Sequence, residues 1–223
     1  MQGTSPNSSI GAAALNRSAR KHEAILTAAT DVFLRNGYLG TNMDDIAEVS
    51  AVSKQTVYKH FASKEALFIE IVTNMTNAAT DVVHSEAPAL DDGDDLAEYL
   101  LDYAYRQLTV VLTPRLMQLR RLVIGEVNRF PDLGKALFEG GPKRAMAAFA
   151  MTLERLGDRG LLAIDNPGVA ASQFNWLIMS APLNRAMLLG DQAIPTPAGL
   201  RRHAAEGVRV FLAAYGNQRR QPE

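Results

Sequence analysis

The sequence predicts an all-α protein that has a small N-terminal three-helix unit and a larger C-terminal helical domain. Apolar residues recur at three- and four-residue spacing along most of the chain, which is the pattern of amphipathic helices. The apolar and polar alternation that marks a half-buried strand does not run for any length. With 223 residues, of which 47% are hydrophobic, the chain can bury a sizeable core in one or two domains.

The composition is that of a globular, soluble protein, and we expect a cytoplasmic one. The chain has no cysteine, which fits a reducing compartment. Its start lacks the basic residues and the apolar run of a signal peptide, and no apolar run is long enough to span a membrane. The net charge of −1 hides a mild asymmetry, since residues 1–64 hold seven Lys/Arg and five Asp/Glu. Any nucleic-acid binding must therefore rest on placed contacts rather than on a strong overall field.

The N-terminal region divides into a tail and a helix. Residues 1–16 are rich in Ser, Gly, Ala and Asn, and we expect them to be a disordered tail. The basic cluster that follows, Arg17, Arg20 and Lys21, fits either a solvated helix entry or an arm that touches DNA. A helix is predicted over residues 18–36, with Gly37 as its end and with one apolar stripe: Ile25, Ala28, Ala29, Val32 and Phe33.

Residues 41–64 read as two short helices joined by a tight turn. Thr41 is the expected N-cap of the first helix, because Asp44 and Asp45 follow in its first turn, where the helix dipole favours negative charge. Four apolar residues of this helix are expected to face inward: Met43, Ile46, Ala47 and Val49. The turn spans residues 50–52, and Ser53 is the N-cap expected for the second helix.

The second of these helices has a basic, polar and aromatic face. Val57 and Phe61 lie on its apolar side, whereas the other side carries Lys54, Gln55, Thr56, Tyr58 and Lys59. A helix fits the major groove of DNA, where Gln and Thr can bond base edges while Lys and Tyr reach phosphate oxygens. A helix-turn-helix unit that binds duplex DNA needs this arrangement.

The run SKQTVYKHFASKEALF, with TNMDDIAEVSAV before it, closely resembles the DNA-binding domain of the tetracycline-repressor (TetR) family of transcriptional regulators. One departure is Ala51, where that family usually has glycine, because alanine is strained in a left-handed turn. The resemblance and the polar face together predict the following DNA-binding residues: Thr41, Asn42, Ser53, Lys54, Gln55, Thr56, Tyr58, Lys59, His60 and Lys64.

A long helix is expected to connect the two parts of the chain. Its apolar stripe runs from about Ser63 to His84: Leu67, Phe68, Ile71, Val72, Met75, Ala79 and Val82. In the family that the sequence resembles, the fourth helix leans against the DNA-binding domain and carries ligand-induced movement to it. The acidic run Asp91–Asp95 that follows lacks the alternating ligands and distant Glu of a calcium loop, so we interpret it as a solvated loop and helix cap.

The remaining chain predicts further helices over residues 95–112, 115–130, 131–157, 169–189 and 198–215. Pro114 suits the N1 position of its helix, and the Gly140-Gly141-Pro142 run predicts a kink or break. The segment RLVIGEVNRFPDLGKALFEGGPKRAMAAF, with DNPGVAASQFNWLIMSAP after it, resembles the C-terminal domain of AefR-like members of the same family. This second resemblance implies an effector-binding and dimerisation domain over residues 65–216, after a DNA-binding domain over 17–64 and before a tail of 217–223.

An enzyme is the main alternative from another class, and the sequence offers little for it. The four histidines stand far apart, and no HExxH pair, GxSxG elbow, phosphate loop or dinucleotide glycine pattern is present. We therefore expect no catalytic residues, no metal and no cofactor. A second alternative is a constitutive DNA-binding regulator, but the large second domain exceeds what a dimerisation hairpin requires.

The predicted function is a ligand-responsive repressor that binds a palindromic operator as a homodimer and is released by a small, largely apolar effector, with no membrane partner. Large apolar side chains are the candidates for lining the effector site, although each alone fits ordinary core packing: Met75, Tyr99, Tyr103, Leu119, Val123, Phe138, Phe149, Trp176 and Met179. The dimer is expected to pair the last two long helices, and the positions expected to be buried, either in that interface or in the domain's own core, are Phe174, Leu177, Ile178, Ala181, Leu188, Val208, Phe211 and Leu212.

Overall fold

The computed structural model describes residues 7–85, 90–91 and 93–217, and this part of the chain contains helices but no β-strand. The all-α prediction is confirmed. The elements are α1 (Asn7–Gly40), α2 (Met43–Val49), α3 (Lys54–His60), α4 (Lys64–Ser85), α5 (Leu96–Val111), α6 (Pro114–Glu126), α7 (Pro131–Phe138), the π-helical turn η1 (Glu139–Lys143), α8 (Arg144–Asp158), α9 (Pro167–Leu189), the 3-10 turn η2 (Asp191–Ala193) and α10 (Pro197–Tyr215). None of the helices in this part of the chain is long and apolar enough to cross a membrane.

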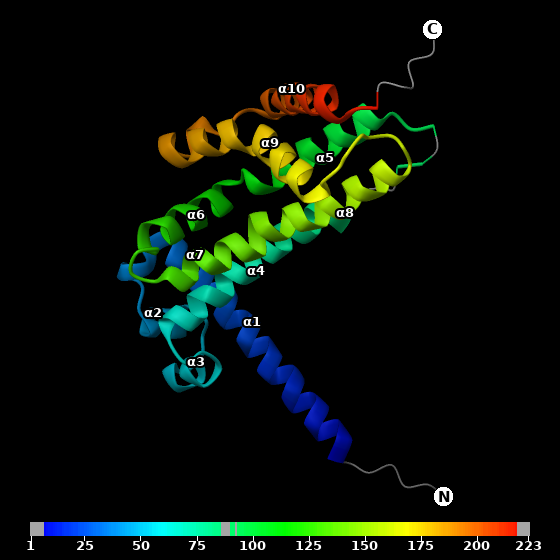
Figure 1. The fold of residues 1–223 in the computed structure, drawn as a ribbon. Coiled ribbons are helices and arrows are strands. Elements are labelled where there is room, and N and C mark those ends of the chain that lie inside the picture. Colours follow the sequence, from blue (N-terminus) through cyan, green and yellow to red (C-terminus); the bar gives the residue numbers. More distant parts are fainter. Residues whose placement is uncertain (1–6, 86–89, 92, 218–223) are drawn as a thin grey trace, which may run out of the picture.

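Helix α1 begins at Asn7, so residues 7–16, where a disordered tail was expected, are helical in the structure, while residues 1–6 lie outside the described part. The sequence explains the longer helix, because residues 12–15 are three alanines and a leucine, which are strong helix formers. The N-terminal part of α1 projects from the body of the molecule (Figure 1), and its burial begins near Ile25. Gly37 interrupts α1 with a φ of 74°, as predicted.

The N-terminal unit packs α1, α2 and α3 around one apolar cluster. Ile25, Phe33, Ile46 and Val57 are fully buried in it. Two details of the sequence interpretation are wrong. The N-cap of α2 is Asn42, whose side-chain oxygen accepts from two backbone amides in the first turn, and Val49 is 52% exposed because it ends the helix on the solvent side.

Helix α4 connects this unit to the C-terminal domain and runs beside α8, while α9 and α10 cover the end of the molecule that lies opposite α2 and α3 (Figure 1). Most of the predicted stripe of α4 is buried or half-buried. Val82 is 40% exposed, however, and the next residue, Val83, takes the inward position. Further along the chain, a row of packed rings forms the C-terminal core: Tyr103, Phe149, Phe174 and Phe211.

The two parts share a core through α6 and α7. Leu119 and Val123 of α6 and Leu133 of α7 are fully buried in the cluster of the N-terminal unit. Helix α6 ends at Glu126 rather than near residue 130. Because α6 packs on α1, a displacement of α6 would also displace the N-terminal unit.

The predicted kink or break at residues 140–142 is instead a widened helical turn, so α7 runs through η1 into α8. Pro142 has no N–H to donate, and the π turn accommodates it. Gly140 permits a close approach to α4, since a Cβ there would lie 2.5 Å from Thr76 Oγ1, and Thr80 Oγ1 donates a 3.1 Å hydrogen bond to the Gly140 carbonyl. Sequence position alone did not indicate this contact.

Candidate nucleic-acid interface and effector cavity

The start of helix α3 is fixed by its N-cap, and its orientation is fixed by its buried side. The Ser53 side chain accepts a hydrogen bond from the Thr56 backbone amide, which confirms the predicted N-cap. Val57 is fully buried and Phe61 is 3% exposed, so they anchor the helix to α1 and α2. The opposite face of α3 is therefore turned to solvent.

Most of the predicted DNA-binding residues lie on or beside that face. The exposed ones are Asn42, Ser53, Lys54, Gln55, Tyr58 and Lys59, whereas Thr56 is half-buried. Lys54 Nζ lies 2.8 Å from Asp44 Oδ1, which joins α3 to α2. Ala51 in the turn has a φ of 54°, so the turn keeps the left-handed geometry although no glycine is present.

Two of the predicted DNA-binding residues have internal roles instead. Thr41 is buried, and its hydroxyl donates a 2.7 Å hydrogen bond to the Gly37 carbonyl. The Lys64 ammonium donates to the carbonyls of Tyr38 and Thr41, at 2.9 Å each, and lies over the Tyr38 ring. Both residues therefore fix the chain between α1 and α2 rather than extend the solvent-facing surface of α3.

His60 also faces inward, toward α1. Its ring lies 5.6 Å from that of His22, which in turn stacks on Phe61 and lies 2.6 Å from a carboxylate oxygen of Glu70 on α4. Burial, followed by His22, Lys59 and Lys21, lowers the pKa of His60. This contact between α1, α3 and α4 was missed by the sequence analysis, because residues 22, 60 and 70 show no common spacing.

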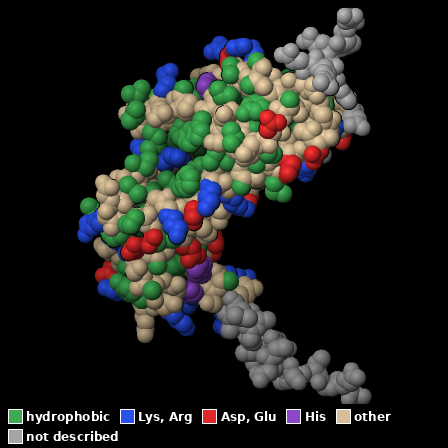
Figure 2. Space-filling view, in the orientation of Figure 1, with side chains coloured by type: hydrophobic (Ala, Val, Ile, Leu, Met, Phe, Trp, Pro, Cys, Tyr) green, Lys and Arg blue, Asp and Glu red, His purple; other side chains and the backbone are tan. Residues whose placement is uncertain are grey.

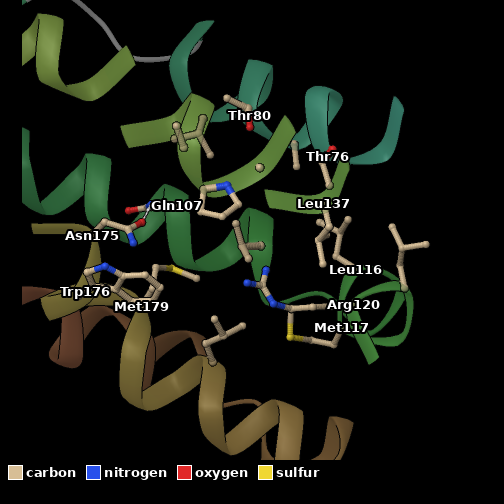
Figure 3. Close-up of a pocket in the computed structure, with 18 residues that line it drawn as sticks. Thr76, Thr80, Gln107, Leu116, Met117, Arg120, Leu137, Asn175, Trp176 and Met179 are labelled. Carbon is tan, nitrogen blue, oxygen red and sulfur yellow. Dashed lines mark hydrogen bonds between the residues drawn. The ribbon is translucent and has the colours of Figure 1, made fainter. Parts of the chain in front are cut away.

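The C-terminal domain holds an apolar cavity of about 70 Å³ between α4, α6, η1 and α9. Figure 2 shows the corresponding hollow among hydrophobic side chains, with Lys or Arg atoms inside it, and Figure 3 shows its walls. The apolar walls come mainly from Val83, Val111, Leu116, Met117, Leu119, Leu137, Pro142, Trp176, Met179 and Leu183.

Only three of the predicted effector-site residues line this cavity: Leu119, Trp176 and Met179. Tyr99 and Tyr103 line a second cavity of about 440 Å³, together with His84. Phe149 is packed between Tyr103 and Phe174 in the core, and Phe138 is 51% exposed. Met75 and Val123 pack with the N-terminal cluster instead, because α4 and α6 turn those positions toward α1.

The polar residues of the first cavity were missed by the sequence analysis, which looked for large apolar side chains. Gln107 Nε2 donates a 2.9 Å hydrogen bond to Asn175 Oδ1, and both side chains are buried. Gln107 Oε1 is buried without a hydrogen-bond partner in the structure. Arg120 is the only charged residue among the described ones that line this cavity. A single arginine in an amphipathic helix gives no sequence signal that separates it from surface arginines.

Comparison with known proteins addresses the same two parts of the chain. Residues 25–71 match the model of bacterial regulatory proteins of the tetR family, and residues 98–217 match that of the C-terminal domain of AefR-like transcriptional repressors. The second match alone covers more than half of the chain. The chain belongs to the TetR family of transcriptional regulators.

Relatives within the TetR family span most of the chain. An HTH-type transcriptional repressor of Mycobacterium tuberculosis is 32% identical over 174 residues, which are 76% of this chain and 80% of the relative. The crystal structure of a TetR-family regulator from Mesorhizobium loti is 40% identical, with a TM-score of 0.85, and covers 90% of this chain and 98% of its own. The flavonoid-responsive regulator FrrA is 29% identical, with a TM-score of 0.73, over 90% of this chain and 99% of its own.

Proposed function

We propose that this regulator is a repressor that binds a palindromic operator through α3 as a homodimer and that a small effector releases it. The observation that carries the DNA-binding part is the solvent-facing side of α3. Among the described residues, Gln55, Tyr58 and Lys59 are exposed and make no hydrogen bond or ion pair, so they are free for DNA. Gln can bond base edges, while Tyr and Lys can reach phosphate oxygens. One relative is a transcriptional repressor, which supports repression rather than activation for this chain.

A homodimer is supported by apolar side chains that α9 and α10 leave exposed. Leu188 is 80% exposed, and Val169, Trp176, Leu189 and Val210 are each at least 41% exposed. Of the dimer residues predicted from sequence, Phe174, Ile178, Val208 and Phe211 lie in the core of the single chain instead. Two recognition helices one DNA turn apart, ~34–36 Å, would read a palindrome.

Effector control is supported by the position of the first cavity between α4 and α6. Helix α4 begins four residues after the end of α3, and α6 is bonded to α1 by Arg115 to Asp31, at 2.8 Å, and by Gln118 to the Leu34 carbonyl, at 2.6 Å. A cavity of about 70 Å³ is small. A dry cavity of ~150 Å³ holds benzene, so a ligand of that size or larger must move the walls of this one.

A ligand changes operator affinity only if it binds the two arrangements of the protein unequally. Widening the cavity between α4 and α6 would favour an arrangement in which the N-terminal units are displaced. A typical coupling of ~1–3 kcal/mol corresponds to a ~5–150-fold loss of operator affinity. FrrA is described as responsive to flavonoids, which supports a small ligand of largely aromatic character for this chain.

The experiment that tests the proposal is selection of bound fragments from a random pool of duplex DNA. We expect a palindromic consensus, and light scattering should give a dimer at micromolar protein. Recovery of no consensus would contradict operator binding, and a monomer would contradict the α9 and α10 interface. A consensus whose affinity no stabilising compound changes would instead support a constitutive regulator.

A further inference from the structure

Arg120 carries an uncompensated charge in an apolar cavity. The residue sits in α6 and is half-buried, and Figure 3 shows its guanidinium among the side chains that line the cavity. It makes no hydrogen bond or ion pair with any of the described residues, and no Asp or Glu is among those that line the cavity. Burial lowers the pKa of the Arg120 guanidinium, and no nearby carboxylate opposes this shift.

The next residue, Arg121, differs from Arg120 because its guanidinium has partners within the protein. Arg121 lies 2.7 Å from Asp191 Oδ1 and donates a 3.1 Å hydrogen bond to the Ala186 carbonyl. Buried and partly buried charges in proteins are normally paired, because an unpaired charge in an apolar environment lowers stability. Arg120, in contrast to Arg121, is available to pair with an anion that is not part of the chain.

We propose that the effector is a small organic anion, with a carboxylate or phenolate oxygen that pairs with Arg120 and a flat apolar body held by the cavity walls. This rests on the proposed function, since it names the chemistry of the ligand that the same cavity would take. An arginine guanidinium matches a carboxylate with two parallel hydrogen bonds, which a neutral amide or alcohol cannot form with the same strength.

The rest of the cavity is consistent with such a ligand. Trp176, Met179 and Leu137 provide apolar surface, and Trp and Met suit the faces and edges of flat rings. Gln107 Oε1 accepts no hydrogen bond from the protein, so a hydroxyl on the ligand body would satisfy it. The hydroxyl protons of Thr76 and Thr80 are already donated to backbone carbonyls, so Arg120 is left as the charged donor of the cavity.

The test uses matched probes on the full-length protein: benzoate and 2-naphthoate against benzamide and 2-naphthamide, with 2-naphthol as the phenol. Binding is measured by calorimetry and by thermal shift. We expect the acids to bind at least ~10-fold more tightly than their amides, because charge-assisted hydrogen bonds exceed neutral ones. Binding of a carboxylate should be flat between pH 6.5 and 9.5, whereas binding of the naphthol should strengthen as its hydroxyl, with a pKa of ~10 for a phenol, ionises.

Arg120→Met and Arg120→Gln should abolish the preference for acids, whereas the control Arg121→Met should keep it. Without any ligand, Arg120→Met should raise the melting temperature by ~2–6 °C, because it removes an unpaired charge, and Arg121→Met should lower it. Equal or tighter binding of the amides, no binding by any probe, or a lowered melting temperature for both Arg120 variants would overturn the assignment.

Operator affinity, measured in parallel, separates this inference from the proposed function. If the amides bind the protein as tightly as the acids and cause it to dissociate from the operator, the proposal of ligand control stands, whereas the pairing of an anionic ligand with Arg120 is wrong. If the acids bind through Arg120 but leave operator affinity unchanged, the charge assignment stands and ligand control fails.

Discussion

Gln118 Nε2 donates a 2.6 Å hydrogen bond to the backbone carbonyl of Leu34, two positions along α6 from the arginine that enters the cavity. The bond joins α6, which lines the proposed effector cavity, to α1 without passing through α4. Helix α6 thus lines the cavity on one side and contacts the N-terminal unit on the other. A rigid element with two such contacts is a physical route for coupling between two sites.

We expect Gln118→Leu to weaken this coupling while the protein still binds operator and probe acid. The ratio of operator dissociation constants with and without 2-naphthoate should fall toward one, and the affinity for 2-naphthoate alone should change less than ~3-fold. Asn128→Leu, an exposed position beyond the end of α6, should leave the ratio as in the wild type. An unchanged ratio for Gln118→Leu would show that α4 alone carries the signal.

The solvent-facing side of α3, which is proposed to contact DNA, gives a second prediction. The double change Tyr58→Ala, Lys59→Ala should weaken binding to every duplex sequence and reduce its salt dependence, because phosphate contacts carry no sequence information. Gln55→Ala should instead relax the preference at one position of each half-site, by ~1–3 kcal/mol. Fluorescence anisotropy at several salt concentrations measures both. The control is Glu48→Ala on exposed α2 surface, and an unaltered affinity for the double variant would contradict the proposed face.

Gly140 is predicted to be essential to the packing of η1 on α4. Replacing a helical glycine with alanine normally stabilises a protein by ~0.5–1 kcal/mol. At Gly140 the added Cβ would lie 2.5 Å from Thr76 Oγ1, so we expect Gly140→Ala to lower the free energy of unfolding by ~1–3 kcal/mol. Gly125→Ala is the matched control, since nothing lies within 4 Å of its Cβ, and it should be stabilising. Urea unfolding of the two variants compares them, and a stabilised Gly140→Ala would refute the close approach.

Two half-buried histidines are expected to make stability fall in mild acid. Burial is the largest cause that lowers the pKa of both His60 and His84, and His84 Nε2 has no hydrogen-bond partner in the structure. Nearby charges have smaller effects: His22, Lys59 and Lys21 also lower the pKa of His60, while at His84 Arg144 and Arg106 lower the pKa and Asp81 raises it. Each histidine therefore binds its proton less readily in the folded protein than in the unfolded chain.

The sign follows from proton linkage. Above a pH of ~6.5, the ordinary histidine pKa, both histidines are neutral in the folded and in the unfolded protein, so they do not lower the free energy of unfolding. As the pH falls below ~6.5 the unfolded chain takes up protons first, so stability declines until the folded pKa is passed. We expect His84→Met to reduce this slope between pH 7.5 and 5.5, and Tyr99→Phe in the same cavity to retain it. Chemical unfolding at each pH measures the slope, and an unaltered slope in His84→Met would contradict a neutral His84.

The sequence by itself determined the local features of this protein. Helical periodicity, the Ser53 cap and the break at Gly37 depend on residues within a few positions of one another, and the structure confirms them. The same holds for the polar side of α3, because burying Val57 and Phe61 leaves only one way for the other side chains to point. The left-handed φ of Ala51 was not legible from the residue itself, because alanine disfavours that conformation; only the family resemblance pointed to a turn that usually takes glycine.

Only the tertiary structure decided which residues meet across the chain. It turned Val123 and Met75 toward α1, held Lys64 against the end of α1, and brought Gln107 beside Asn175, which is 68 positions away. It also separated Arg120, which faces the cavity alone, from Arg121, which has a carboxylate partner. Periodicity places a side chain on one face of its own helix. Which neighbour covers that face depends on how helices far apart in the sequence pack, so the environment of a charge is a property of the assembled fold.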